Sequence, residues 1–220
     1  MRNLGFYQAS SFRKAGLLYQ QKKKVMPHTA QFLESLHRET ETLLQKAIGE
    51  WQMLPPEVLS AQPAPTQWSA AQCLEHLNIY GRYYLPAMEK AIQKASQNGT
   101  VPAREFHSGW LGSYFTNLML PKPDGKLKST MKAPKNAVPA AHPDARAMLA
   151  EFIDQQETML QLLHAAAAVN LNQVRIPISI MPWLRLKLGD TFSFVIAHIE
   201  RHVLQAERAM AVAKQPVSPL

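Results

Sequence analysis

The sequence predicts an all-α fold whose long helices pack as a four-helix bundle. Four segments carry apolar residues at helical spacing over several turns each. Glycine is scarce, with 9 in 220 residues, whereas methionine, leucine and alanine, which favour helices, are frequent. Because 46% of the residues are hydrophobic, a chain of this length can bury one sizeable core. We therefore expect a single helical domain.

The first predicted helix runs from about Thr29 to Leu54. Its apolar residues recur every three or four positions, as in an amphipathic helix. Pro55 and Pro56 end the pattern, because proline cannot donate a hydrogen bond inside a helix. The apolar stripe consists of Phe32, Leu33, Leu36, Leu43, Leu44, Ala47 and Trp51.

The second predicted helix begins after Ser69. The Ser69 hydroxyl can accept from the backbone of Gln72 while the Gln72 side chain reaches back, which forms a capping box. Trp68 can then pack on Cys73 in the first turns. Pro86 lies within the pattern and either kinks the helix or restarts it. One face carries Cys73, His76, Leu77, Tyr80, Tyr84 and Met88.

The third predicted helix opens at Pro143-Asp144 and ends before Asn170. The chain between the second and third helices, residues 97–142, is far longer than the usual links in a bundle. It must order against the core or cross over the bundle. Within it, the apolar stretch from Phe106 to Leu120 predicts a short helix that acts as a lid around Trp110. The third apolar stripe contains Met148, Phe152, Met159, Leu162 and Leu163.

The fourth predicted helix runs from Asp190 to Val212, with Asp190 as its N-cap carboxylate. The apolar residues 176–183 before it predict a packed, extended loop. The helix carries His198 and His202, which at positions i and i+4 project from one face about 6 Å apart along the axis. Two neutral imidazoles at this spacing can point at one metal ion. The apolar stripe contains Phe192, Val195, Ile199, Val203, Ala206 and Met210.

The histidine pair does not form the zinc-protease motif His-Glu-x-x-His. Ile199 follows His198, and Glu200, the acid between the two histidines, falls opposite His198 on a helical wheel. The glutamate that serves as general base in such proteases is therefore missing from this helix face, which argues against a peptidase.

Charge and cysteine content limit the partners and the compartment. The basic residues include six within 1–26, where no acid occurs, and the remaining chain holds 18 basic and 16 acidic residues. We expect this leader to be an upstream extension or a disordered arm and not a nucleic-acid-binding surface. The basic stretch from Lys122 to Lys135 predicts a solvated loop, or one that attracts an anionic ligand. The single Cys73 excludes an intrachain disulfide and fits a reducing cytoplasm. No stretch approaches the ~18 apolar residues of a membrane span.

Two segments resemble the signature regions of the DinB/YfiT-like superfamily. In Trp68 to Leu77, a Trp-Ser opening leads to one histidine, and in Leu188 to Gln205 two histidines are followed by glutamine. The resemblance covers roughly residues 28–213 and implies an up-down-down-up bundle with one long crossover. We accordingly expect a leader at 1–26, a bundle domain at 27–214 and a tail at 215–220.

The resemblance also implies a three-histidine divalent metal site formed by His76, His198 and His202. By the same likeness, Arg201 and Gln205 are candidates for contacts with the ligands or the substrate. Tyr80 is a further candidate of this kind. Cys73 could complete a closed structural site, whereas three histidines and a water leave the open position that catalysis needs. Zinc or nickel suits imidazole best, and iron and manganese stay open.

The same resemblance suggests the chemistry. Characterised relatives include metal-dependent thiol S-transferases that use bacillithiol or mycothiol and a mycothiol-dependent maleylpyruvate isomerase. An open three-histidine ion lowers the pKa of a bound water or thiol toward neutrality. We expect a thiol S-transferase whose partners are a small-molecule substrate and a low-molecular-weight thiol, and not nucleic acid or membrane. A metal-dependent hydrolase, a non-catalytic metal- or ligand-binding bundle and a homodimeric assembly stay open.

Overall fold

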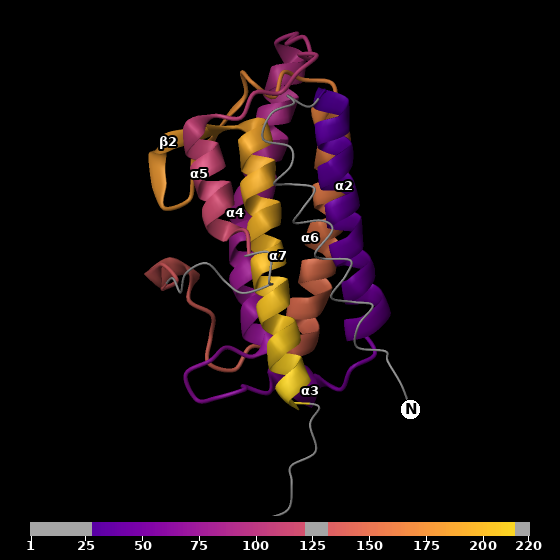
Figure 1. The fold of residues 1–220 in the computed structure, drawn as a ribbon, viewed down its shortest axis with the longest axis vertical. Coiled ribbons are helices and arrows are strands. Elements are labelled where there is room, and N and C mark those ends of the chain that lie inside the picture. Colours follow the sequence, from indigo (N-terminus) through magenta and orange to yellow (C-terminus); the bar gives the residue numbers. More distant parts are fainter. Residues whose placement is uncertain (1–27, 122–131, 214–220) are drawn as a thin grey trace, which may run out of the picture.

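The computed structural model describes residues 28–121 and 132–213 (Figure 1). Within these ranges the chain is mostly helical and contains one small two-stranded sheet. The predicted helical character is confirmed, the described chain adds a small sheet that the prediction did not include, and the four-helix bundle stays a prediction. The predicted leader, the predicted tail and most of the basic stretch from Lys122 to Lys135 lie outside the described residues.

The first long helix, α2, spans Thr29–Lys46 and continues as a short π-helix, η2, over Ala47–Trp51. It ends before Pro55, as predicted, and the five-residue helix α3 follows at Pro56–Ser60. Six of the seven residues of the predicted stripe are buried, and the seventh, Phe32, is half-buried.

The second long helix, α4, spans Ala70–Gln97 and begins with the predicted capping box. The Gln72 N–H donates to the Ser69 hydroxyl at 3.2 Å, and the Ser69 N–H donates to the Gln72 side-chain oxygen at 3.0 Å. The helix runs unbroken through Pro86, so a restart at that residue is excluded.

The third and fourth long helices are α6 at Ala145–Ala166 and α7 at Leu188–Ala213. Asp144 caps α6 by accepting from two backbone N–H groups. The predicted N-cap of α7 is wrong, because the helix begins at Leu188 directly after a strand and Asp190 lies within its first turn. The Asp190 carboxylate accepts instead from Ser108 and Gly109, directly before another helix, α5, at Trp110–Met119.

The small sheet is an antiparallel hairpin of β1, Arg175–Ile178, and β2, Met181–Lys187. It corrects the predicted packed loop. A two-stranded ribbon has only edge positions, where proline is tolerated, so Pro177 and Pro182 can both occur within it. The burial of Ile176 and Ile178 on one face holds the hairpin against the helices.

The predicted lid is a short helix, α5, spanning Trp110–Met119. Trp110 was expected to pack at the middle of this lid, but the residue is 83% exposed. The opposite face, which carries Phe115 and Met119, lines a cavity. A short 3₁₀ turn, η3, at Lys135–Ala137 lies later in the same long connection and contacts α4.

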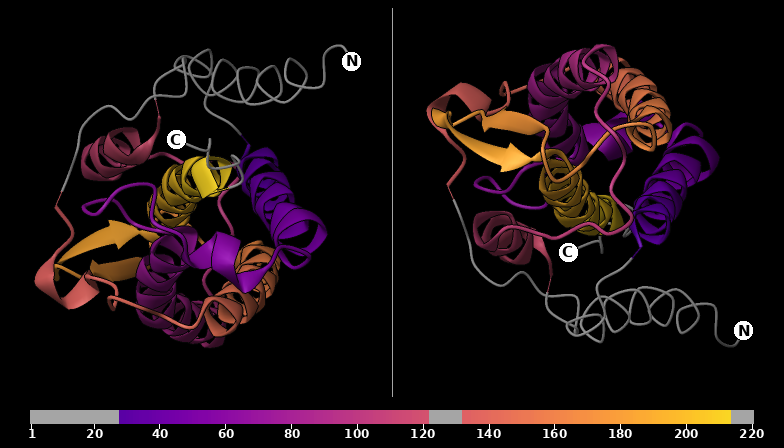
Figure 2. Two further views of the ribbon diagram at one scale, coloured as in Figure 1. Left: turned by 90° about the horizontal axis from the view of Figure 1, so that it is seen from below. Right: turned by 90° about the horizontal axis from the view of Figure 1, so that it is seen from above.

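The four long helices share one core. Helix α4 packs against α6 and α7, and α2 packs against the same two helices. Seen along the long axis, α5 and the hairpin lie on the far side of α4 and α7 from α2 (Figure 2). The up-down-down-up order and the domain limits of 27 and 214 stay predictions. Among the described residues, every helix is too short or too polar to span a bilayer.

Candidate metal centre

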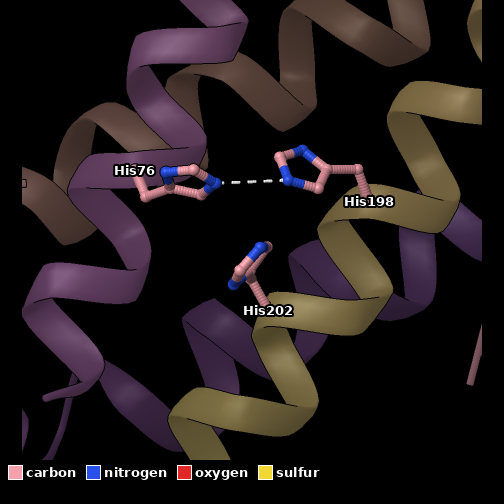
Figure 3. Close-up of side chains that lie close together, drawn as sticks. All are labelled: His76, His198 and His202. Atoms are coloured by element: carbon pink, nitrogen blue, oxygen red, sulfur yellow. Dashed lines mark hydrogen bonds between the residues drawn. The ribbon is translucent and has the colours of Figure 1, made fainter. Parts of the chain in front are cut away.

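Three histidines from two helices meet beneath α5 and the hairpin. His76 comes from α4, and His198 and His202 come from successive turns of α7 (Figure 3). One ring nitrogen from each lies within 4.8 Å of one from each of the others, and all three residues are buried. The structure therefore brings together the three residues that the resemblance implied.

Hydrogen bonds to the outer ring nitrogens orient two of these rings. Nδ1 of His76 lies 2.6 Å from the carbonyl oxygen of Ala137 in η3, and Nδ1 of His202 lies 3.0 Å from the side-chain oxygen of Gln205. Both partners are acceptors, so each Nδ1 carries the proton and each Nε2 keeps its lone pair. Such outer contacts fix the tautomer and the ring angle of metal-binding histidines.

The spacing of the inner nitrogens suits a metal ion. Nε2 of His76 lies 3.3 Å from Nε2 of His198. Two imidazole nitrogens bound tetrahedrally to zinc at ~2.0–2.1 Å would lie about 3.3 Å apart. The three-histidine cluster thus suggests a divalent metal site and is compatible with a metal-binding enzyme.

The centre opens into a cavity of about 620 Å³. Aromatic and aliphatic side chains, many of them from α4, α5, α7 and the hairpin, form much of its wall, and Lys132, Arg201 and Arg208 bring positive charge to it. No carboxylate occurs among the described residues that line it. The aromatic and aliphatic residues of the wall are Pro63, Trp68, Tyr80, Tyr84, Phe115, Met119, Ala133, Pro134, Ile178, Ile180, Leu186, Phe194, Ala209 and Val212.

The comparison with protein families decides the relationship. A sequence profile described as the DinB superfamily matches residues 29–206. The chain belongs to the DinB superfamily. Neither the comparison with curated proteins nor the comparison with solved structures gave a match at the significance required.

Burial keeps the histidines of this DinB-superfamily chain neutral. Desolvation lowers the pKa of His76, against a smaller opposing effect of its bond to Ala137. It lowers the pKa of His198 well below the ordinary value and that of His202 to about 3, and the neighbouring histidines add to both shifts. Neutral imidazoles are the form that binds metal, so the donor set fits a divalent ion.

The three other predicted site residues all line the cavity. Gln205 supports His202 directly, and the Tyr80 ring lies 4.5 Å from the His198 ring and 5.1 Å from the His76 ring, centroid to centroid. Arg201 is buried, and this burial lowers the pKa of its guanidinium.

Two acidic or nucleophilic side chains beside the histidines are not part of the cluster. Cys73 is absent from the described metal-binding group, and burial raises its pKa to about 12. Glu200 does not line the cavity, as its position on the helical wheel predicted, and burial followed by the charge of Glu39 raises its pKa to about 8.

The sequence analysis missed several parts of the site. The Trp68 ring lies 5.0 Å from the His76 ring and 6.0 Å from the His202 ring, so it forms part of the wall of the centre, a role that the predicted packing on Cys73 did not include. Phe194 stacks parallel to His198, one turn before it in α7. The spacing of four residues between them was a usable signal. No sequence signal could have identified the carbonyl oxygen of Ala137, because every residue type carries a backbone carbonyl.

Proposed function

We propose that this chain is a divalent-metal-dependent enzyme that transfers a low-molecular-weight thiol to a small electrophilic molecule. The observation that carries the proposal is the convergence of three neutral, buried imidazoles in the wall of a 620 Å³ cavity. Three protein ligands leave a coordination position for a reactant, as in catalytic zinc sites. Membership of the DinB superfamily agrees with this chemistry.

His76, His198 and His202 would hold the ion through nitrogen, with zinc or nickel favoured by imidazole ligands. The ion would act as a Lewis acid that makes a thiol nucleophilic near neutral pH. Ala137 and Gln205 keep two of the rings in the binding tautomer. The aromatic wall formed by Trp68 and its neighbours limits the access of water.

The cavity wall suggests the substrate class. An apolar wall with a few charged groups at fixed positions favours a small molecule that has an apolar body and an anionic group. Lys132, Arg201 and Arg208 supply the positive charge for such a group. Lys132 belongs to the basic stretch from Lys122 to Lys135, which the sequence predicted to be either a solvated loop or a loop that attracts an anionic ligand. A thiol that carries carboxylates would meet the same requirement.

Metal content tests the centre itself. The purified protein should hold about one divalent ion per chain, and alanine at His76, His198 or His202 should abolish stoichiometric binding, as measured by elemental analysis. His164→Ala is a matched control, because His164 is exposed on α6. Full occupancy in the His76→Ala, His202→Ala double variant would contradict the proposal.

A panel of nucleophiles tests the reaction. Bacillithiol, mycothiol, glutathione, coenzyme A and water would be offered with halogenated, epoxide and maleyl acceptors, with and without chelator. Turnover that requires both metal and one thiol supports the transferase. Turnover with water alone identifies a hydrolase, and ligand binding without turnover identifies a non-catalytic binding protein, so either result would contradict thiol transfer.

The proposal extends to compartment and partners. A single, buried Cys73 suits a reducing compartment such as the cytoplasm. The charged residues of the cavity wall can bind a small anionic molecule. We propose that nucleic acid and membranes are not partners. Salt-dependent DNA affinity retained by a chain that starts at Met26 would contradict this part of the proposal.

A further inference from the structure

The large cavity extends along α7 on both sides of the histidines. The residues of α7 in its wall run from Phe194 to Val212, a distance of about 27 Å at the helical rise of ~1.5 Å per residue. The inner half of the cavity lies toward Phe194, with the wall residues of α4, α5 and the hairpin. The outer half lies toward Val212, with the wall residues that precede Trp68.

Aromatic rings form much of the inner half. The Tyr80 ring of α4 lies 4.5 Å from the His198 ring. The Tyr84 ring, one turn further along α4, lies 6.0 Å from the Phe194 ring, which is one turn earlier in α7. Phe115 of α5 also lies 6.0 Å from Phe194. Figure 1 shows α5 and the hairpin beside the part of α7 where that helix begins.

The inner half offers no charge to a ligand. Within the residues that the structure describes, α4, α5 and the hairpin contribute no charged side chain to the wall. The Ser179 N–H donates to the Tyr84 hydroxyl at 3.1 Å, and this hydroxyl donates to the Ser179 hydroxyl at 3.3 Å, so these polar groups bond to each other. A charged group placed here would lose its hydration without a compensating partner. The inner half therefore favours an apolar ligand.

The outer half is mixed, with polar and basic side chains beside small apolar ones. Gln205 and Arg208 come from the C-terminal turns of α7, and Thr66 and Gln67 come from the segment between α3 and α4. Figure 1 shows this segment at the end of the molecule where α7 ends. These side chains supply hydrogen-bond donors and acceptors and one positive charge, which an anionic polar ligand can use.

The outer half also has the length for an extended ligand. From His202 to Val212, α7 covers about 15 Å. Arg201 carries positive charge at the near end of this stretch, beside His202 in the chain, and Arg208 carries it about 10 Å farther along. Lys132, on the segment before η3, adds a further cation to the wall. A ligand whose anionic groups lie several bonds from its reacting atom fits this half better than a compact one.

We propose that the two halves bind two different reactants. The inner half holds the apolar body of the electrophilic acceptor, and the outer half holds the anionic, hydrogen-bonding part of the thiol. Both reactants then present their reacting atoms at the histidines, from opposite directions along α7. The assignment to acceptor and thiol rests on the proposed function, whereas the division into an apolar site and an anion site requires neither an ion nor turnover.

Simultaneous binding tests the division. The probe for the inner half is N-phenyl-1-naphthylamine, a neutral apolar dye whose binding is followed by fluorescence. The probes for the outer half are the S-methyl derivatives of bacillithiol, glutathione and coenzyme A, whose binding is followed by calorimetry. We expect the dye and at least one derivative to bind together, with or without zinc. Displacement of the dye by the derivative, or failure of the dye or of all three derivatives to bind, would overturn the proposal.

Substitutions in each half should weaken one probe only. Phe115→Ala should raise the Kd of the dye about 10-fold, because it removes apolar contact area, and leave the Kd of the derivative unchanged. Arg208→Gln should raise the Kd of the derivative about 5-fold, as expected for an exposed ion pair, and leave that of the dye unchanged. Tyr114→Ala and Arg38→Gln are the matched controls, because both residues are exposed and lie outside the cavity wall.

The outcomes separate this proposal from the proposed function. If Phe115→Ala does not fold, Ile180→Ser in the exposed turn of the hairpin tests the same half. A variant in either half that weakens both probes equally would show one undivided site and overturn the division. Thiol transfer by a protein whose probes compete would leave the proposed function intact, whereas independent probes without turnover would support the division and contradict the transferase.

Discussion

Burial determines the protonation state of the residues around the centre. It lowers the pKa of His202 to about 3 and raises that of Cys73 to about 12, because in each case the charged form would lose its hydration. The imidazole is thereby ready to bind a cation, whereas the thiol stays protonated. Among the described residues the cluster of possible ligand atoms contains the three histidines and not Cys73.

We expect Cys73 to be inert in the native protein. At a pKa of about 12, only about one thiol in ten thousand is ionised at pH 8, and the thiolate is the reactive form. Ellman's reagent should therefore not react until the protein is unfolded in guanidinium chloride, when one thiol per chain should be released. Cys73→Ala should keep the zinc affinity of the wild type, and a large loss would show that the sulfur is a ligand.

Single-residue roles were predictable where the partners lie close in the chain. The capping box of Ser69 and Gln72 spans three residues and is confirmed. Asp190 has the same short-range signal for an N-cap, but its partners, Ser108 and Gly109, lie about 80 positions earlier in the chain. Contacts over that distance are fixed by the tertiary structure, which local sequence does not encode.

The start of helix α5 sits directly on the Asp190 carboxylate. The Gly109 N–H donates to it at 3.0 Å, and the Ser108 hydroxyl donates to its other oxygen. A Cβ atom added at Gly112 would lie 2.2 Å from the carboxyl carbon of Asp190, so only glycine allows this approach. Helix α5 thus contacts α7 through the backbone of Gly112, where there is no room for a side chain.

Gly112→Ala should destabilise the protein by about 1–3 kcal/mol, because the added methyl group forces α5 away from Asp190. Gly49→Ala is the matched control, since nothing lies within 4 Å of the added Cβ and alanine favours a helix. Urea denaturation would measure both free energies of unfolding. Equal effects of the two substitutions would contradict the close packing of α5.

Asp190 should also make stability depend on pH. Burial raises its pKa, against opposing effects of Ser108 and Gly109. The contribution of such a carboxyl is greatest below its unfolded pKa of ~3.9 and is lost as the pH rises through the folded pKa. Relative to Asp190→Asn, the wild type should therefore lose stability as the pH rises above ~4, the unfolded pKa of the carboxyl.

Urea denaturation at several pH values measures this difference. Asp154→Asn is the control, because Asp154 is an exposed carboxylate on α6. A wild type that gains stability relative to Asp190→Asn as the pH rises would show that the native structure favours the charged carboxylate.

The long helices were predictable as elements, and the hairpin was not. Apolar residues that recur with a period of 3.6 over many turns predict a helix clearly, as in α2, α4, α6 and α7. The strands of the hairpin are short and contain Pro177 and Pro182, which argue for a loop when read alone. Similarly, the apolar residues of α5 predict a packed helix but not which face packs, and Trp110 proved to face solvent.

At the scale of the whole molecule, the centre depends on how α4 and α7 are placed against each other. His76 and His198 are 122 residues apart in the chain and 3.3 Å apart between their Nε2 atoms. Helical periodicity indicates which face of each helix is buried but not the height at which two helices meet. His76 was therefore identified through the family resemblance and not through residue spacing.

Zinc should stabilise the whole molecule, because the centre exists only when both helices are in place. A ligand that binds only the folded state at 1,000 times its Kd adds about 4 kcal/mol to the free energy of unfolding. We expect the Tm of the wild type to rise with zinc and to fall with chelator. The His76→Ala, His202→Ala double variant should show neither shift, and an equal shift there would place the binding site elsewhere.

The absence of a carboxylate from the described cavity wall has an electrostatic consequence. Three neutral ligands leave a bound divalent ion with its full charge of +2, and Arg201 and Arg208 in the same wall add to it. On the proposed function, an anionic reactant would supply the counter-charge. By reciprocal linkage, an anionic reactant should raise the affinity of the protein for the ion by the same factor by which the ion raises its affinity for the reactant. Neutral analogues of the true substrate would lack this mutual reinforcement, even where their shape fits the cavity.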